Sequence, residues 1–359
     1  MNRPQQTVPE RPAAPAWPLR TVRQAGCPAC GSAGCTLHPE LADRLFGTPG
    51  NWCMRRCTER GCATAWLDPA PHPDDLWMAY QAYYTHDENQ PPRLPGTLGQ
   101  QVWAAWKLGY PMPEDGLARL AGAAMLLQPR RRDRALSARL YLPFVPGGRL
   151  LDIGCGSGGQ LRAMRTLGWD ALGLEPDAAA LAAARQQGLE VHAGDLTTVR
   201  FEADSFDGLS MLHVIEHLPE PAWQLAECRR ILRPGGRLLL VTPNVDALGH
   251  RWFGADWRGL EPPRHLQLYS PSALAQAVRA AGFEVEQVHS RAAGAARMLR
   301  ISAQIRAARR RGQAHLDPRR RRLADLRWRL LGLLERSLVA LGRPCGEEIV
   351  LLGRRPLRS

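Results

Sequence analysis

Three acidic residues and a run of glycines have the spacing of a nucleotide-binding site. Asp152 lies just before the run Gly154-Cys155-Gly156-Ser157-Gly158-Gly159. Glu175 and Asp195 follow at intervals of about 20 residues, the distance that separates successive strands of a nucleotide-binding fold. Glycines let the backbone turn tightly and let a ligand approach closely. Glu175 could accept both hydroxyls of a ribose and Asp195 the exocyclic amine of adenine, so the pattern predicts a bound adenosine.

The glycines alone do not identify the nucleotide, because Gly154, Gly156 and Gly159 also fit the dinucleotide fingerprint of NAD enzymes. Asp152 separates the two cases. A carboxylate at the mouth of this loop would repel a pyrophosphate, whereas it suits the cationic amino-acid end of S-adenosylmethionine (SAM). We therefore expect SAM, contacted by the following residues: Asp152, Gly154, Cys155, Gly156, Gly158, Glu175, Asp195 and His213.

His213, Glu216 and His217 are candidates for proton transfer. Methyl transfer to a hydroxyl requires a base, and imidazole titrates near neutral pH. Either histidine could take the proton. In the competing interpretation, His213 lines the cofactor, while Glu216 and His217 only fix the loop.

Six of the nine cysteines lie between residues 27 and 62. Cys27 and Cys30 have the two-residue spacing of a metal knuckle, and Cys57 and Cys62 form the second pair, which predicts a tetrahedral, structural zinc site. Cys53 could replace Cys57, and His38 is a weaker substitute. The alternative is a set of packed, reduced thiols, but so short a segment needs a staple.

Beyond residue 146, short β-type runs alternate with helical runs, as in βαβ units with a parallel sheet. The predicted strands are 149–153, 171–174, 190–192, 206–212, 236–241, 284–289 and 347–352, and the predicted helices are 159–167, 177–187, 221–232 and 272–282. This alternation would bring the glycine loop and the acidic residues to one edge of the sheet.

The sequence resembles the class I SAM-dependent methyltransferases, in particular bacterial ubiquinone-pathway O-methyltransferases and sugar methyltransferases with an N-terminal zinc-binding module. The resemblance covers roughly residues 145–290 and is carried by residues 151–158, 205–208, 213–219, 230–237 and 242–244. It implies an α/β fold with a doubly wound, mostly parallel, seven-stranded Rossmann-like sheet, whose last two strands form an antiparallel pair. In the plain fold these two strands are joined briefly, whereas residues 291–346 intervene here.

We expect five segments along the chain. They are a disordered leader (1–22), a zinc-ribbon-like module (23–70), a helical connector (71–144), the methyltransferase domain (145–290 plus 347–356) and a basic helical insert (291–346). The aromatic stretch 244–270 is expected to form a lid over the acceptor, or else to pack on the connector. We find no secretory signal and no apolar run long enough to span a membrane, so a cytoplasmic protein is expected.

The net charge of +13 is concentrated in the insert, where residues 300–330 contain eleven arginines against two aspartates. Leucines between 323 and 341 follow helical spacing with arginines interleaved. Three options remain open: a helix packed on the domain with a solvated arginine face, peripheral contact of 300–341 with an anionic membrane at its inner face, and RNA binding. RNA is the least favoured because no base-reading motif is present.

These observations predict an enzyme that transfers a methyl group from SAM to a hydroxyl of a small-molecule, sugar or lipid-linked acceptor. The alternatives are a sugar-type C-methyltransferase, a SAM-binding protein without catalysis that uses its zinc module for interaction, and, as a minor one, an RNA methyltransferase.

Overall fold

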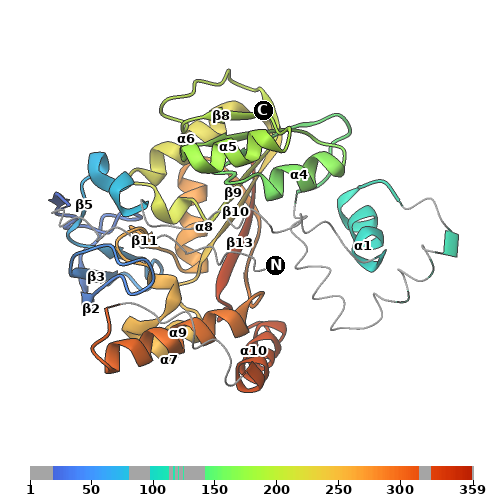
Figure 1. Cartoon of the computed structure of the whole chain (residues 1–359). Helices are drawn as coiled ribbons and strands as arrows, with labels where there is room; N and C mark the ends of the chain where they lie inside the picture. Colours follow the sequence, from blue (N-terminus) through green and yellow to red (C-terminus); the bar gives the residue numbers. More distant parts are fainter. Residues whose placement is uncertain are drawn as a thin grey trace, which may run out of the picture.

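A central seven-stranded sheet organises the chain, for which we obtained a computed structural model that describes residues 19–80, 98–112, isolated positions between 116 and 124, 142–314 and 325–357. The sheet has the order β12-β13-β10-β9-β6-β7-β8 (Figure 1). The strands are β6 (Arg149–Ile153), β7 (Asp170–Glu175), β8 (Val191–Ala193), β9 (Phe206–Leu212), β10 (Leu232–Pro243), β12 (Glu284–Arg291) and β13 (Glu348–Arg354). Only β13 runs antiparallel to its neighbours, so the predicted fold class is confirmed.

Helices cover both faces of this sheet, which is why its central strands are apolar in nearly every position. They are α4 (Gly159–Thr166), α5 (Ala178–Gln186), α6 (Pro221–Ile231) and α8 (Pro271–Ala280). Leu150 of β6 packs in the cluster that includes α4 and α5, whereas Leu151 packs in the cluster that includes α6 and α8. Each predicted strand and helix of this domain is found within a few residues of its expected ends.

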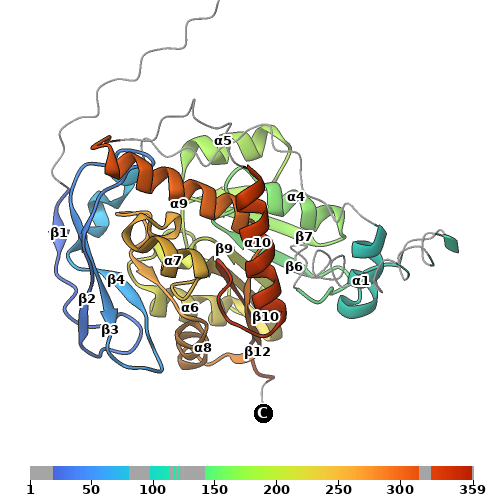
Figure 2. The same ribbon diagram turned by 90° about the horizontal axis from the view of Figure 1, so that it is seen from below.

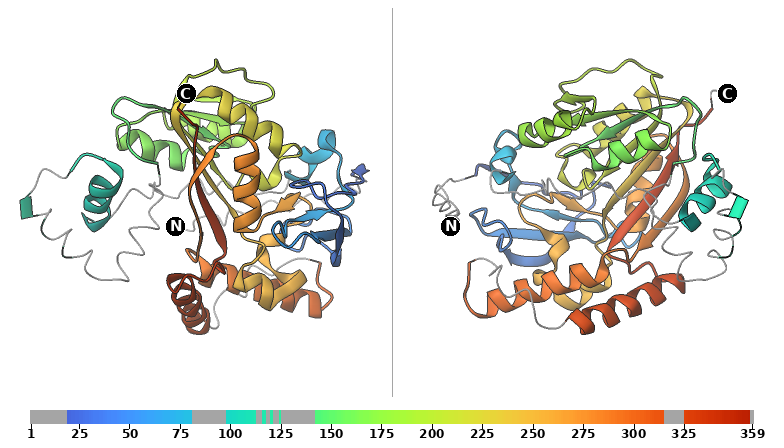
Figure 3. Two further views of the ribbon diagram at one scale, coloured as in Figure 1. Left: turned by 180° about the vertical axis from the view of Figure 1, so that it is seen from behind. Right: turned by 45° about the vertical axis from the view of Figure 1, so that its right-hand side comes forward.

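The cysteine-rich module forms a second, smaller sheet with the order β11-β4-β3-β2. Three of its strands come from the module: β2 (Gly34–Leu41), β3 (Trp52–Cys57) and β4 (Ala65–Leu67). The fourth, β11 (Gln267–Leu268), belongs to the large domain and pairs antiparallel with β4. In Figures 1 and 3 the module lies beside β11 and α8, on the opposite side of the molecule from α1 (Leu98–Leu108). The module is therefore joined to a segment of the large domain by backbone hydrogen bonds.

The aromatic stretch after β10 is folded and mostly buried. It folds into α7 (Leu248–Phe253), two short 3-10 helices, η3 (Gly254–Asp256) and η4 (Arg258–Leu260), and β11. Trp257 and Tyr269 are each 1% exposed because they pack in cores shared with the module. The buried rings of this stretch therefore attach the module to the domain, and a lid over the acceptor stays a prediction.

The connecting segments are described only in part. Residues 1–18 of the expected leader lie outside the described residues, but Thr21–Val22 form strand β1, which pairs with β5 (Ala70–Pro71). Of the expected helical connector, the structure describes the 3-10 helix η1 (Pro73–Tyr80) and α1. The insert forms α9 (Ala295–Arg310) and α10 (Asp325–Ala340), which pack on each other next to α7 (Figure 2). No helix among the described residues has the length and apolar character of a membrane span.

Candidate functional site

The glycine loop connects β6 to α4 at the carboxyl edge of the sheet. Gly154 and Gly156 adopt φ values of 66° and 57°, a left-handed region that other residues adopt at a cost. A Cβ at Gly156 would meet open space, so the loop is accessible from this side, whereas a Cβ at Gly158 would clash with Leu189. Gly156 is thus open to a ligand, while Gly158 lets the loop pack closely on α5 and the following Leu189.

The three predicted acidic residues lie along this edge on neighbouring strands. Glu175 ends β7, and its carboxylate accepts hydrogen bonds from the backbone N–H groups of Gly156 at 2.7 Å and Asp177 at 2.9 Å. Asp152, on β6, is buried and accepts a hydrogen bond from the Ser210 hydroxyl at 2.6 Å. The loop amide and the Glu175 carboxylate hold each other in place, so the predicted ribose acceptor is tied to the glycine turn.

Asp195 follows β8, next to Glu175, whose carbonyl accepts the Gly194 N–H at 3.0 Å. Its carboxylate accepts hydrogen bonds from Thr197 and Thr198. Partial burial opposes ionisation, but these bonds outweigh it and lower the pKa of Asp195. The structure therefore brings together the glycine loop, Glu175 and Asp195 at the ends of adjacent strands, as the sequence predicted. Cys155 is a buried thiol whose pKa burial raises.

His213 lies at the end of β9 in a strained backbone conformation, with φ of 56°. Its Nδ1 is 3.5 Å from Glu216, and its Nε2 is 3.3 Å from Glu348. Burial lowers the pKa of His213, but the two carboxylates outweigh this and raise it to about 10. In this arrangement the imidazole is protonated at neutral pH and acts as a donor.

Glu216 is fully buried beneath His213. One carboxylate oxygen accepts a hydrogen bond from the Thr242 hydroxyl at 2.9 Å. Burial opposes ionisation, but His213 and the neighbouring histidines lower the pKa of Glu216 to about 2. Glu216 is therefore a fixed negative charge that orients and charges His213.

His217 is held differently. Its Nδ1 is 3.0 Å from the carbonyl oxygen of Arg264 and 2.9 Å from the hydroxyl of Tyr80. A carbonyl can only accept, so the proton of the neutral ring lies on Nδ1 and the lone pair on Nε2. His217 is only partly buried. It is thus the histidine of this loop whose geometry suits a proton acceptor.

His265 completes the cluster and was not predicted as a site residue. Its ring centroid is 4.7 Å from that of His217, and its Nδ1 is 2.7 Å from the Gly259 carbonyl oxygen. Burial lowers the pKa of His265 to about 4. Ligand atoms of Glu216, His217 and His265 all lie within 4.8 Å of one another, close enough to bind one divalent metal ion. Nothing in the sequence pointed to His265, because this residue lies far from His217 along the chain, shortly before β11, and no motif spacing links the two.

The four predicted zinc ligands, Cys27, Cys30, Cys57 and Cys62, form one cluster. The Sγ atoms of Cys27 and Cys62 are 3.7 Å apart, and those of Cys30 and Cys57 are 3.5 Å apart. Thiolates around a tetrahedral zinc with Zn–S bonds of about 2.3 Å are separated by roughly 3.8 Å, so the cluster has the dimensions of such a site.

The two substitutes considered for the zinc site are not part of this cluster. Cys53 is absent from it, and His38 instead bonds His250, with 2.9 Å between their Nε2 atoms.

Comparison with known proteins places these features in context. A family model described as a methyltransferase domain matches residues 127–288. A ubiquinone biosynthesis O-methyltransferase from Pseudomonas aeruginosa (strain UCBPP-PA14) is 31% identical over 159 residues, covering 40% of this chain and 68% of the relative. One from Hahella chejuensis is 36% identical over 107 residues, covering 28% of this chain and 45% of the relative.

The chain thus spans about two thirds of the length of the Pseudomonas aeruginosa relative and less than half of that of the Hahella chejuensis relative. Among solved structures, an S-adenosylmethionine dependent methyltransferase from Mesorhizobium loti is 20% identical with a TM-score of 0.42, covering 62% of this chain and 98% of that chain.

Proposed function

Because this chain belongs to the class I SAM-dependent methyltransferases, we propose that it transfers the methyl group of SAM to a hydroxyl of a small-molecule, sugar or lipid-linked acceptor. The observation that carries the proposal is the alignment of Gly156, Glu175 and Asp195 at the ends of β6, β7 and β8, with His217 on the loop after β9. This arrangement supports an adenosine at the strand ends, with His217 as the residue that would accept the proton.

Each residue of the site has a role in this reaction. When bound, SAM supplies an electrophilic methyl group on a positively charged sulfur. Glu175 and Asp195 would accept hydrogen bonds from the ribose and the adenine, and Asp152 would attract the cofactor's amino group. His217 would take the acceptor's hydroxyl proton on Nε2, so that the oxygen can attack the methyl carbon. Both N–H groups of His213 face carboxylates, Glu216 and Glu348, so this residue would line the site and would not act as the base.

We also propose a structural zinc ion in the four-cysteine cluster. Four thiolates fill a tetrahedral shell and leave no open position for a substrate. Three of the four cysteines are buried in the same core as Trp66 of the module and Tyr269 of the large domain. An ion there would hold the module in the shape that packs on the domain.

Calorimetry tests cofactor binding. We expect S-adenosylhomocysteine to bind one to one, and Glu175→Gln to weaken this binding at least tenfold because the ribose acceptor loses its charge. Glu190→Gln is the matched control and should bind normally, because Glu190 is exposed and lies just before β8, at the edge of the sheet away from the glycine loop. A chain that binds NADH and is indifferent to S-adenosylhomocysteine would refute the proposal.

Turnover tests the proton acceptor. With phenolic, sugar and lipid-linked hydroxyl compounds as acceptors, release of S-adenosylhomocysteine should fall by about 10²–10⁴-fold in His217→Ala, the usual contribution of a general base. Affinity for S-adenosylhomocysteine should stay within twofold. Normal turnover in this variant would remove His217 from the mechanism. A product methylated on carbon would instead support the sugar-type C-methyltransferase.

A further inference from the structure

The inserted helix α10 is attached to the domain by one face only. Trp328 and Glu335 lie on this face, and both are buried. A carboxylate oxygen of Glu335 accepts the backbone N–H of Glu347 at 3.1 Å, just before β13, and Trp328 packs near Phe253 at the end of α7. The orientation of α10 on the domain is therefore fixed, so its outward face is defined.

That outward face is apolar. Its leucines are 46–79% exposed: Leu326, Leu330, Leu333, Leu334 and Leu341. At 100° per residue these positions fall on one stripe, opposite the attached face. The helix packs on the domain with Arg327, Arg329 and Arg336 exposed, as the first of the three options predicted, but leucines also point away from the protein. A contiguous apolar stripe on a surface helix marks a binding surface.

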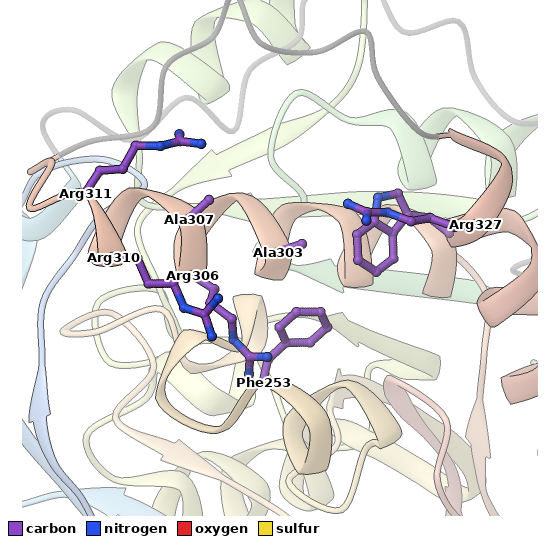
Figure 4. Close-up of a pocket in the computed structure, with 8 residues that line it drawn as sticks. Phe253, Ala303, Arg306, Ala307, Arg310, Arg311 and Arg327 are labelled. Carbon is purple, nitrogen blue, oxygen red and sulfur yellow. The ribbon is translucent and has the colours of Figure 1, made fainter.

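Arginines border this stripe and line an adjoining pocket. A cavity of about 460 Å³ lies between α7, α9 and α10, with Phe253 and Trp328 in its wall. Figure 4 shows Arg306 and Arg310 extending from α9 toward Phe253. The Arg306 guanidinium lies 4.5 Å from the centre of the Phe253 ring.

The other arginines of the pocket have no ion pair with a described residue. Asp256 pairs with Arg306 and Arg309. Among the residues that the structure describes, by contrast, no carboxylate pairs with the three further pocket arginines: Arg310, Arg311 and Arg327. The pocket therefore combines apolar walls with arginines that have no carboxylate partner among the described residues, which suits a phosphate group attached to an apolar body.

We propose that the α9–α10 layer docks on an anionic phospholipid surface, with the leucine stripe at the boundary between headgroups and acyl chains and the pocket arginines on lipid phosphates. A helix that lies in the membrane plane combines such an apolar face with flanking basic residues. Arginines next to it add attraction to anionic lipid. This inference is independent of the proposed methyl transfer, because it concerns a surface formed by the insert.

The same surface fits RNA less well. Proteins that bind single-stranded nucleic acid present aromatic rings on which bases stack, together with basic residues. Here Phe253 and Trp328 are only 7% and 9% exposed, with Arg306 and Arg327 lying over them. Five exposed leucines would be left without a role.

Vesicle flotation of the full chain tests this proposal. We expect binding to phosphatidylcholine vesicles containing 30% phosphatidylglycerol and at least tenfold weaker binding to pure phosphatidylcholine. Leu330→Glu with Leu334→Glu should weaken binding at least tenfold at both 50 and 500 mM salt. Arg310→Gln with Arg327→Gln should abolish most of the preference for phosphatidylglycerol, because the arginines recognise the lipid charge.

Matched controls lie elsewhere on the surface. Leu357→Glu changes a leucine that is 66% exposed near the last strand, and Arg60→Gln changes an exposed arginine of the module. Both should bind vesicles like the unmodified chain, and all variants should keep the same melting temperature. The proposal is overturned by failure to bind phosphatidylglycerol vesicles, by RNA binding that survives the leucine substitutions, or by light scattering in which the leucine variant converts a dimer to a monomer.

Discussion

Arg264 is the residue whose removal should most disturb the contact between the module and the large domain. Its side chain is fully buried, and its guanidinium lies 2.9 Å from Asp43 of the module and 3.1 Å from Glu261 of the large domain. It also donates to the Thr48 hydroxyl and to the Ala79 carbonyl, at 2.9 and 3.0 Å. Arg264→Met keeps the length of the side chain but leaves Asp43 buried without a cation.

Breaking a buried ion pair on one side costs about 3–5 kcal/mol, because the remaining charge stays desolvated. Glu261 retains Arg258, and Asp43 retains three backbone N–H donors, which places the expected loss near 3 kcal/mol. Urea unfolding followed by tryptophan fluorescence measures the change. If Arg264→Met does not fold, Arg264→Lys, which keeps the charge but loses the planar fork, should still show a smaller loss of about 1–2 kcal/mol.

Arg60→Met, at an exposed position of the module, is the control and should change the free energy of unfolding by less than about 0.5 kcal/mol. A loss below about 1 kcal/mol in Arg264→Met would show that Asp43 is rehydrated or repartnered, and the reasoning would fail.

Two further outcomes follow from the acidic residues Glu335 and Glu347 and from the cysteine cluster. Burial and repulsion from Glu347 raise the pKa of Glu335 to about 8, and burial and repulsion from Glu348 raise that of Glu347 to about 7. The folded chain therefore binds more protons than the unfolded chain between about pH 4.5 and 8 and loses stability as the pH rises through this window. Glu335→Gln should remove part of this loss, so its melting temperature should exceed that of the unmodified chain at pH 9 but not at pH 5. Cys30→Ser should lower zinc to well below one ion per chain, whereas Cys35→Ser, an exposed cysteine outside the cluster, should retain it by elemental analysis.

The nucleotide site could be predicted from the sequence because its information is local. Each acidic residue follows its own short apolar run, and parallel strands place their carboxyl ends at one edge of the sheet. Glu175 therefore had to lie near Gly156, and the 2.7 Å hydrogen bond between them follows from the alternation of strands and helices. The zinc ligands were equally accessible, because knuckle spacing restricts which cysteines can share one ion.

The contacts across the two sheets could not be predicted this way. Arg264 and Asp43 are 221 residues apart, and Tyr80 and His217 are 137 apart. No periodicity links such pairs, and the two-residue strand β11 is too short to produce a strand pattern. The aromatic content of residues 244–270 was informative about burial, but composition alone did not tell a lid from an attachment surface.

These long-range contacts connect the module to the chemistry. The Arg264 guanidinium binds Asp43, while the Arg264 carbonyl fixes Nδ1 of His217, and Tyr80, at the end of η1, reaches the same nitrogen. The tautomer that leaves Nε2 free as a proton acceptor is therefore set by residues whose positions depend on the module. Loss of the module's fold would release both partners of Nδ1 while leaving Glu175 and the glycine loop in place. The module is thus a support for His217, and its folding should affect proton transfer more than cofactor binding.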